Sequence, residues 1–343
     1  MANKYLIVVL LVFVGLVACQ STDIAPPFGF EKPANFPDPV YDFAQNPVTQ
    51  EGFELGRMLF YDGLLSRDGT VSCGSCHQQS SGFTQHGHDL SHGIDDQLTL
   101  RNALPIQNLA WEPLQAWDGG VFNLDLFAIV PIEAHNEMDS SLPEVLDKLR
   151  RHPRYPEMFR KAFGSPEITT ARFLKALSQF QLMAISANSR YDRYIRNEGV
   201  QLTSLELQGL EIFRQKCSSC HPEPLFTDGS FRHNGLAIGN PADKGRGDVT
   251  ARAEDDYKFR VPSLRNVEVT RPYMHDGRLR NLQFVLEHYD HGVVDHPHLD
   301  PLLKQHGRLG IPLSAEEQRK IIAFLHTLTD EEFLSNPKLS EFF

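Results

Sequence analysis

The sequence of 343 residues is poor in cysteine and has no long pattern of alternating apolar and polar residues. Four of its five cysteines fall in two C-x-x-C pairs, so the body of the chain has none left for a framework of structural disulfides. The missing alternation argues against a large β-sheet. An apolar run at the N-terminus, residues 5–17, is too short to span a bilayer comfortably.

Basic residues are outnumbered as well. The 33 lysines and arginines face 44 aspartates and glutamates, which gives a formal net charge of −11 at pH 7. Nucleic acid is therefore not an expected partner. A hydrophobic fraction of 41% is sufficient for real cores, and 24 glycines with 22 prolines predict long ordered loops between helices. The length fits one large domain or two of ordinary size.

Two copies of C-x-x-C-H, at residues 73–77 and 217–221, are the strongest motifs in the chain. C-x-x-C-H attaches haem c: the two thiols bond to the vinyl groups, and the histidine becomes the proximal ligand of the iron. The alternative is one zinc site with four thiolate ligands. That site would leave both histidines unused and would have to close a very long loop. We therefore expect two covalently bound haems, held by Cys73, Cys76 and His77 and by Cys217, Cys220 and His221.

The remaining cysteine, Cys19, lies at the end of the N-terminal apolar segment. Residues 1–18 carry Lys4, the apolar run and a small residue before a cleavage point, which is typical of a secretory signal. The sequence LVAC ending at Cys19 resembles a bacterial lipobox, and no aspartate follows it, which favours the outer membrane. An ordinary signal peptide with an incidental cysteine is the alternative. Both interpretations place the protein in the periplasm, where c-type haems are attached.

Helical patterns dominate the rest of the chain, so we predict a mostly α fold. Residues 19–46 read as an extended tether. The phrase before the first haem motif is repeated faintly before the second, which suggests two related haem domains at residues 47–190 and 191–343. Capping boxes at Thr203 and Ser314 mark two helix starts. The expected helices cover residues 49–61, 142–151, 155–163, 169–195, 203–213, 281–289 and 314–328.

In these phrases the chain resembles the bacterial di-haem cytochrome c peroxidase family, which includes the MauG-type enzyme that matures methylamine dehydrogenase. The resemblance covers nearly all of the mature chain. It implies two cytochrome c-like helical domains whose haems face a shared interface. The first haem would meet peroxide, and the second would receive electrons. Its phrases are LFYD at 59–62, residues 71–77, GFT at 82–84, RN at 101–102, WDG at 117–119, residues 217–221, VPSLRN at 261–266 and PYMHDG at 272–277.

The resemblance also implies roles for three side chains. Glu137 matches the catalytic acid–base group, although on the residues alone it would be an ordinary surface glutamate. Trp117 matches a tryptophan between the haems that conducts electrons or holes, the alternative being a core aromatic. His275 matches a histidine near the haem interface that supports its neighbours by hydrogen bonding.

Further positions match the family less closely. His92 resembles a histidine that caps the first haem at rest, with other loop histidines as competitors. Tyr289 stands where peroxidase members place a methionine on the second iron, and the MauG-type enzyme resembles this chain in having a tyrosine there. The alternatives are ligation by His288 or Met274, or an open site. Phe127 replaces a glutamine near the peroxide pocket. A calcium site between the domains would use Asn102, Thr270 and Pro272.

Three functions are consistent with these expectations. The favoured one is reduction of hydrogen peroxide to water by electrons from a periplasmic cytochrome c or cupredoxin, a small donor that the acidic chain would attract. The second is oxidation of tryptophan or tyrosine on a partner protein. The third is a di-haem electron carrier without peroxide chemistry, against which Glu137 and Trp117 argue. A homodimer is left open.

Overall fold

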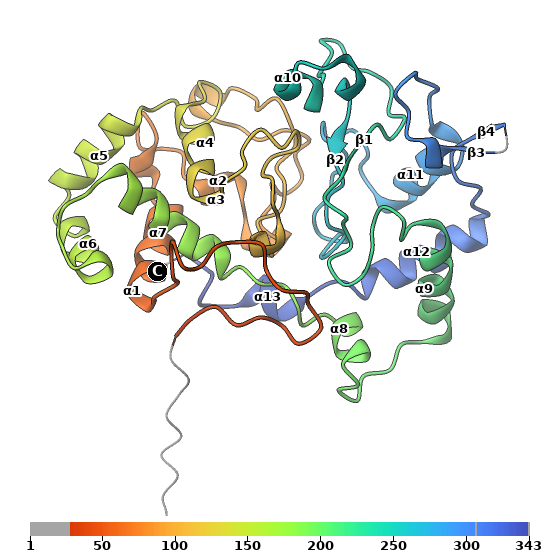
Figure 1. The fold of residues 1–343 in the computed structure, drawn as a ribbon, viewed down its shortest axis with the longest axis horizontal. Coiled ribbons are helices and arrows are strands. Elements are labelled where there is room, and N and C mark those ends of the chain that lie inside the picture. Colours follow the sequence, from red (N-terminus) through yellow and green to blue (C-terminus); the bar gives the residue numbers. More distant parts are fainter. Residues whose placement is uncertain (1–27, 306, 342–343) are drawn as a thin grey trace, which may run out of the picture.

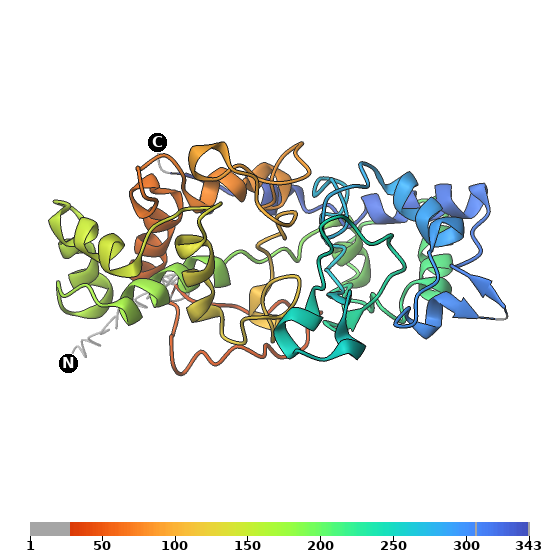
Figure 2. The ribbon, with the colours of Figure 1, turned by 90° about the horizontal axis from the view of Figure 1, so that it is seen from above.

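The computed structural model describes residues 28–305 and 307–341, and within them the chain is predominantly helical. Its elements form two groups that lie side by side along the long axis of the molecule (Figure 1 and Figure 2). The first group contains α1 (Gln50–Tyr61), α2 (Cys73–Cys76), α3 (Leu124–Phe127), α4 (Ile129–Glu133), α5 (Leu142–Arg151), α6 (Tyr155–Phe163) and α7 (Thr170–Leu182).

The second group follows residue 189 and carries the few strands. Its two sheets each have two antiparallel strands, β1 with β2 and β3 with β4. The helices are α8 (Arg190–Ile195), α9 (Ser204–Lys216), α10 (Arg246–Thr250), α11 (Leu282–Glu287) and α12 (Ala315–His326), and α13 (Glu331–Ser335) lies between the groups (Figure 1). The strands are β1 (Phe231–Arg232), β2 (Phe259–Arg260), β3 (Lys304–Gln305) and β4 (Arg308–Leu309).

Local signals in the sequence located most helices correctly. The predictions for α5 and α6 are confirmed at both ends, and Thr49 caps α1 by accepting a hydrogen bond from Gly52 N–H. The capping boxes of Thr203 and Ser314 open α9 and α12 as expected. In each box a hydroxyl and a carboxylate bind backbone N–H groups that the first turn leaves free.

The prediction of one helix over residues 169–195 is wrong. The helix α7 ends at Leu182, and α8 begins only at Arg190. Between them, Ser186 N–H donates to Asn108 Oδ1 at 2.9 Å, and Asn188 N–H donates to Asp330 Oδ2 at 2.8 Å. Because distant side chains take these N–H groups, the segment leaves the helical path.

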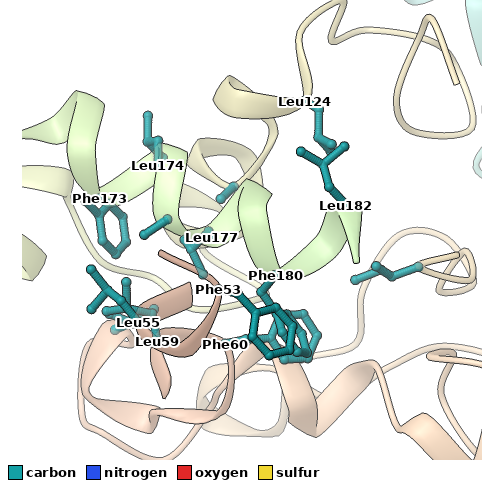
Figure 3. Close-up of a cluster of buried hydrophobic side chains, with 14 of the residues drawn as sticks. Phe53, Leu55, Leu59, Phe60, Leu124, Phe173, Leu174, Leu177, Phe180 and Leu182 are labelled. Carbon is teal, nitrogen blue, oxygen red and sulfur yellow. The ribbon is translucent and has the colours of Figure 1, made fainter. Parts of the chain in front are cut away.

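Each group is built on one close helix pair, α1 on α7 and α9 on α12. A glycine allows the approach in both pairs. A Cβ at Gly56 would lie 1.9 Å from the Ala176 carbonyl oxygen, and one at Gly209 would lie 2.0 Å from that of Lys320. Figure 3 shows the first pair, with phenylalanine and leucine side chains of α1 and α7 meeting between the helices.

A trio of buried phenylalanines repeats in the two groups. Phe60 and Phe180 have ring centroids 4.8 Å apart, and Phe83 lies 6.4 Å from Phe180. In the second group the matching distances are 5.1 Å for Phe213 to Phe324 and 6.2 Å for Phe226 to Phe324. The faint sequence repeat before the two haem motifs is thus accompanied by similar packing of phenylalanines in the two groups.

A buried ion pair of the second group holds part of the N-terminal segment. Arg265 and Asp192 are both fully buried and form two hydrogen bonds of 2.8 and 2.7 Å. From the N-terminal segment, Asn35 donates to the same carboxylate and Phe36 packs under the guanidinium. Removing one partner of such a pair would leave a buried charge without compensation, so the pair is important for keeping Asn35 and Phe36 against the second group.

The ends of the chain cross between the groups. Residues 28–48 contain no helix or strand and run along both groups (Figure 1), and the prediction of a tether over residues 19–46 stays a prediction. At the other end, Phe333 and Leu339 belong to the hydrophobic cluster of the first group. The division at residues 47–190 and 191–343 stays a prediction, and it did not include this return of the C-terminus.

Candidate haem sites

The histidines of the two C-x-x-C-H motifs are held in the same way. His77 Nδ1 lies 2.7 Å from the Phe83 carbonyl oxygen, and His221 Nδ1 lies 2.9 Å from that of Phe226. A carbonyl only accepts, so the proton of each ring is on Nδ1 and the lone pair is on Nε2. Burial lowers the pKa of both histidines, with these backbone acceptors acting in the opposite sense. Two neutral imidazoles are therefore oriented to bind metal through Nε2.

The four motif thiols are free and half-buried. Burial raises the pKa of Cys73 and of Cys217 to about 12, and it also raises the pKa of Cys76 and of Cys220. Each pair thus stays protonated, close to its histidine. This donor set fits covalent attachment of haem c at both motifs.

A cavity of about 790 Å³ opens over the second motif. Its volume lies within the roughly 300–1,000 Å³ typical of cofactor pockets. Most of its lining is apolar, as a porphyrin ring requires. The wall combines Cys217, Cys220 and His221 with Leu264, Val267, Leu282, Val285, Leu286, Ile311, Leu313, Ile321 and Leu325. The residues present therefore fit a haem, and His221 is the side chain that would hold its iron.

Trp117 lies in the wall of this cavity, on the side of the first group. Its indole N–H donates to the Asn102 carbonyl oxygen at 2.8 Å, and Asn102 N–H donates to the His275 carbonyl oxygen at 2.8 Å. Both Asn102 and His275 line the cavity as well. Leu104 lines it too, and the Leu104 backbone lies beside the His77 ring. Only a thin stretch of chain thus separates the two histidine sites.

Glu137 lies beside the first motif. Its carboxylate is near enough to Cys73 and Cys76 to raise the pKa of both thiols. Burial raises the pKa of Glu137 itself, and no donor among residues 28–305 and 307–341 hydrogen-bonds to this carboxylate. A carboxyl group with a raised pKa takes up a proton more readily than an ordinary surface glutamate.

His92 lies on the loop that packs against Glu137. The backbone N–H of Ile94 donates to the Glu137 carbonyl oxygen at 2.8 Å. The His92 side chain is 39% exposed, its Nδ1 lies 2.5 Å from Asp96 Oδ1, and its ring meets that of His88 edge to face. The structure thus brings His92 near the first site with Nε2 available, and its role as a distal ligand stays a prediction.

Three candidates for the distal side of the second site are now placed. Tyr289 and Met274 line the cavity, whereas His288 is absent from its wall and turns its Nε2 to the Asn234 carbonyl oxygen at 3.1 Å. The predicted helix over 281–289 ends at Glu287 and continues as a π-helical turn, η6 (His288–Gly292). Burial raises the pKa of Tyr289 to about 12. Such turns often redirect side chains at functional sites.

Known proteins match the chain over most of its length. The sequence model of the di-haem cytochrome c peroxidase family matches residues 50–199. Methylamine utilization protein MauG of Methylorubrum extorquens is 36% identical over 305 residues, which cover 88% of this chain and 84% of that protein. The chain belongs to the di-haem cytochrome c peroxidase family. It is therefore an oxidoreductase of a family whose cofactors are haem c.

Two further relatives represent the branches of this family. Cytochrome c551 peroxidase of Nitrosomonas europaea is 34% identical, with 84% of this chain and 83% of that protein covered. A crystal structure described as a MauG-like protein associated with microbial copper homeostasis is 33% identical, with a TM-score of 0.82. The match covers 92% of this chain and 99% of the chain in that crystal structure. Both peroxidase and MauG-type relatives are thus close to this chain.

The calcium site that the family resemblance implied remains a prediction. Asn102, Thr270 and Pro272 all line this cavity. Asn102 Nδ2 donates to the Asp89 carbonyl oxygen at 2.9 Å, which leaves Asn102 Oδ1 to accept or to bind a cation. Backbone carbonyls at the other two positions would complete an oxygen-only site.

Two further residues of the cavity could not be predicted from the sequence. Phe259 stacks on His275 with ring centroids 3.7 Å apart, and Asn234 lies between Met274 and His288. Both line the cavity. Neither belongs to a motif or lies at a fixed spacing from one, so the sequence carries no signal for them.

The N-terminal predictions cannot be followed into the structure. Cys19 and the signal segment 1–18 lie outside the described residues. Among the helices of residues 28–305 and 307–341, none is long and apolar enough to cross a bilayer.

Proposed function

We propose that this family member uses hydrogen peroxide to oxidise a tryptophan or tyrosine side chain on a partner protein. One haem c would be attached at Cys73 and Cys76, in a first domain over residues 47–190. The other would be attached at Cys217 and Cys220, in a second domain over residues 191–343. Iron with an openable position would supply the redox chemistry at the first site. The observation that carries the proposal is the presence of Tyr289, and not His288, in the wall of the second cavity.

Glu137 would handle protons at the first site. Its side chain is half-buried, its carboxylate accepts no hydrogen bond from the described residues, and it lies next to the thiols of the first motif. It is suited to take a proton from one peroxide oxygen and return it to the other as the bond between them breaks. A plain electron carrier has no use for such a group, so Glu137 argues against that alternative.

Trp117 would connect the sites. Its indole ring lines the second cavity, and its N–H is bound to Asn102, which also contacts His275. An oxidisable ring fixed by hydrogen bonding suits transfer of electrons between the two centres. Phe127 stands where the family resemblance puts a glutamine of the peroxidases, and a phenylalanine there would leave the peroxide pocket less polar, which suits a slow peroxide consumer.

Reduction of peroxide by an external donor is the second candidate. Met274 lines the same cavity as Tyr289, and methionine ligation is the arrangement that accepts electrons from a high-potential donor. The similarity to the Nitrosomonas europaea peroxidase favours this function as well. A small periplasmic cytochrome c or cupredoxin would then be the partner.

Stopped-flow mixing with peroxide separates these functions. For partner oxidation, we expect the fully oxidised protein to react with peroxide and then to return slowly to its resting spectrum. Reduced cytochrome should accelerate that return only weakly. Multiple rapid turnovers with reduced cytochrome would instead favour the peroxidase function. If neither the oxidised nor the half-reduced protein reacts with peroxide, the protein is an electron carrier.

We also propose that the mature chain is periplasmic and anchored to the outer membrane through a lipid on Cys19. The lipobox-like LVAC sequence supports this location. Cys19→Ser should move the protein from the membrane fraction to the soluble periplasmic fraction while both haems remain attached. Unchanged fractionation of the variant would refute the anchor and leave export itself intact.

A further inference from the structure

Two side chains of types that can bind haem iron line one cavity. Tyr289 and Met274 both line the space over His221. A tyrosinate oxygen and a thioether sulfur give iron very different potentials. The protein therefore needs a feature that lets one of them bind and keeps the other away.

Asn234 is in contact with both candidates. Its Nδ2 lies 3.3 Å from Met274 Sδ, a hydrogen-bonding distance for sulfur. Tyr289 lines the same cavity as Asn234, and the Asn234 side chain lowers the pKa of the Tyr289 hydroxyl against the larger effect of burial. Because Nδ2 carries two hydrogens, it can serve the sulfur and the oxygen together. Asn234 itself lines the cavity between them.

The orientation of the Asn234 amide is fixed from outside the cavity. Its Oδ1 accepts a hydrogen bond of 3.2 Å from Leu236 N–H, and its main-chain oxygen faces His288 Nε2 at 3.1 Å. An inverted amide would set its NH₂ group against the Leu236 N–H, so the nitrogen must point into the cavity. His288 thus has a structural use in holding the Asn234 backbone.

Met274 is held in place by its own turn. Its φ of 76° lies in the left-handed region, which is uncommon for residues other than glycine. Gly277 N–H donates to the Met274 carbonyl oxygen at 3.2 Å, and Tyr273 N–H donates to that of Leu279 at 2.7 Å. The turn sets where the sulfur lies, and the hydrogen bond from Asn234 engages one of its two lone pairs and restrains its position.

We propose that Asn234 is a positioning residue that selects Tyr289 over Met274 as the ligand of the second haem. It does so by keeping the Met274 sulfur in a hydrogen bond and by donating to the tyrosine oxygen. The inference rests on the tyrosine ligation assumed under the proposed function. It goes further in naming the group that maintains this ligation and the ligand that would replace it.

The test uses the haem-loaded protein and four variants. Asn234→Leu removes both N–H donors, and Asn234→Asp removes them while keeping the shape and the acceptor for Leu236. In each, we expect the near-infrared charge-transfer band of methionine–iron ligation to appear and the potential of one haem to rise. Asn234→Leu combined with Met274→Leu should lose the band, and Met274→Leu alone should keep the wild-type spectrum.

The outcomes separate this inference from the proposed function. A methionine band in the wild-type protein would overturn both. Suppose that the wild-type protein lacks that band and that Asn234→Leu or Asn234→Asp has the same spectrum as the wild type. This result would overturn the role of Asn234 and leave the tyrosine ligation standing. A band that persists in the double variant would show that another group, and not Met274, is the replacement ligand, which also overturns the inference.

Discussion

Glu137→Gln is expected to slow the reaction with hydrogen peroxide by roughly 10²–10⁴-fold, the usual contribution of a positioned acid–base group. Glutamine has nearly the same size and shape, so the change removes proton transfer and little else. Burial is the cause of the raised pKa of Glu137, and no hydrogen bond from the described residues would be lost. The rate is measured by stopped-flow absorbance under a large excess of peroxide.

Glu133→Gln is the matched control, because Glu133 ends the neighbouring helix α4 and is exposed to solvent. We expect that variant to react at the wild-type rate. Intact mass under denaturing conditions should show two haems on both variants, which excludes a defect in maturation. A fully active Glu137→Gln protein with both haems in place would make Glu137 a surface residue without a catalytic role.

The sequence predicted those helices whose signals are local. Thr203 and Ser314 open α9 and α12 through capping boxes that lie within four residues. The break after Leu182 could not be predicted, because it depends on Asn108 and Asp330, which are remote from it in sequence. The buried pair of Arg265 and Asp192 is likewise invisible until the chain has folded.

The same distinction holds for the site. The C-x-x-C-H motifs are local, and their histidines are oriented by carbonyl groups five and six residues further along the chain. Asn234 could not be found in this way, since its partners Met274 and His288 are brought to it by the fold. The roles that the sequence assigned to Glu137 and Trp117 through family resemblance stay predictions.

The local backbone structure distinguishes Tyr289 from its neighbour His288. The π-helical turn η6 adds a residue to the helix end and separates Tyr289, which lines the cavity, from His288, which does not. Ile311 N–H donates to the Tyr289 carbonyl oxygen at 2.6 Å, and a Cβ at Gly310 would lie 2.4 Å from that oxygen. Glycine at position 310 is therefore required for this backbone contact.

Tyr289→Phe is expected to change the ferric spectrum of one haem only and to raise its reduction potential. A tyrosinate oxygen is anionic and stabilises ferric iron, so its loss favours the ferrous state. The shift should be a sizeable part of the ~0.8 V over which axial ligands set haem potentials. Partner oxidation should fall with it, since the second haem would hold oxidising charge less easily, while the direct reaction of the first site with peroxide should persist.

Spectroelectrochemical titration of the wild-type protein and the variant measures both effects. Phenylalanine keeps the aromatic packing of the cavity wall, so a change confined to one haem reports the lost oxygen. Met274 remains in the same cavity, and Tyr289→Phe combined with Met274→Leu shows whether the sulfur replaces the oxygen. If the wild-type protein already shows the methionine charge-transfer band, or if Tyr289→Phe leaves both haem spectra unchanged, tyrosine is not the ligand and the peroxidase function gains support.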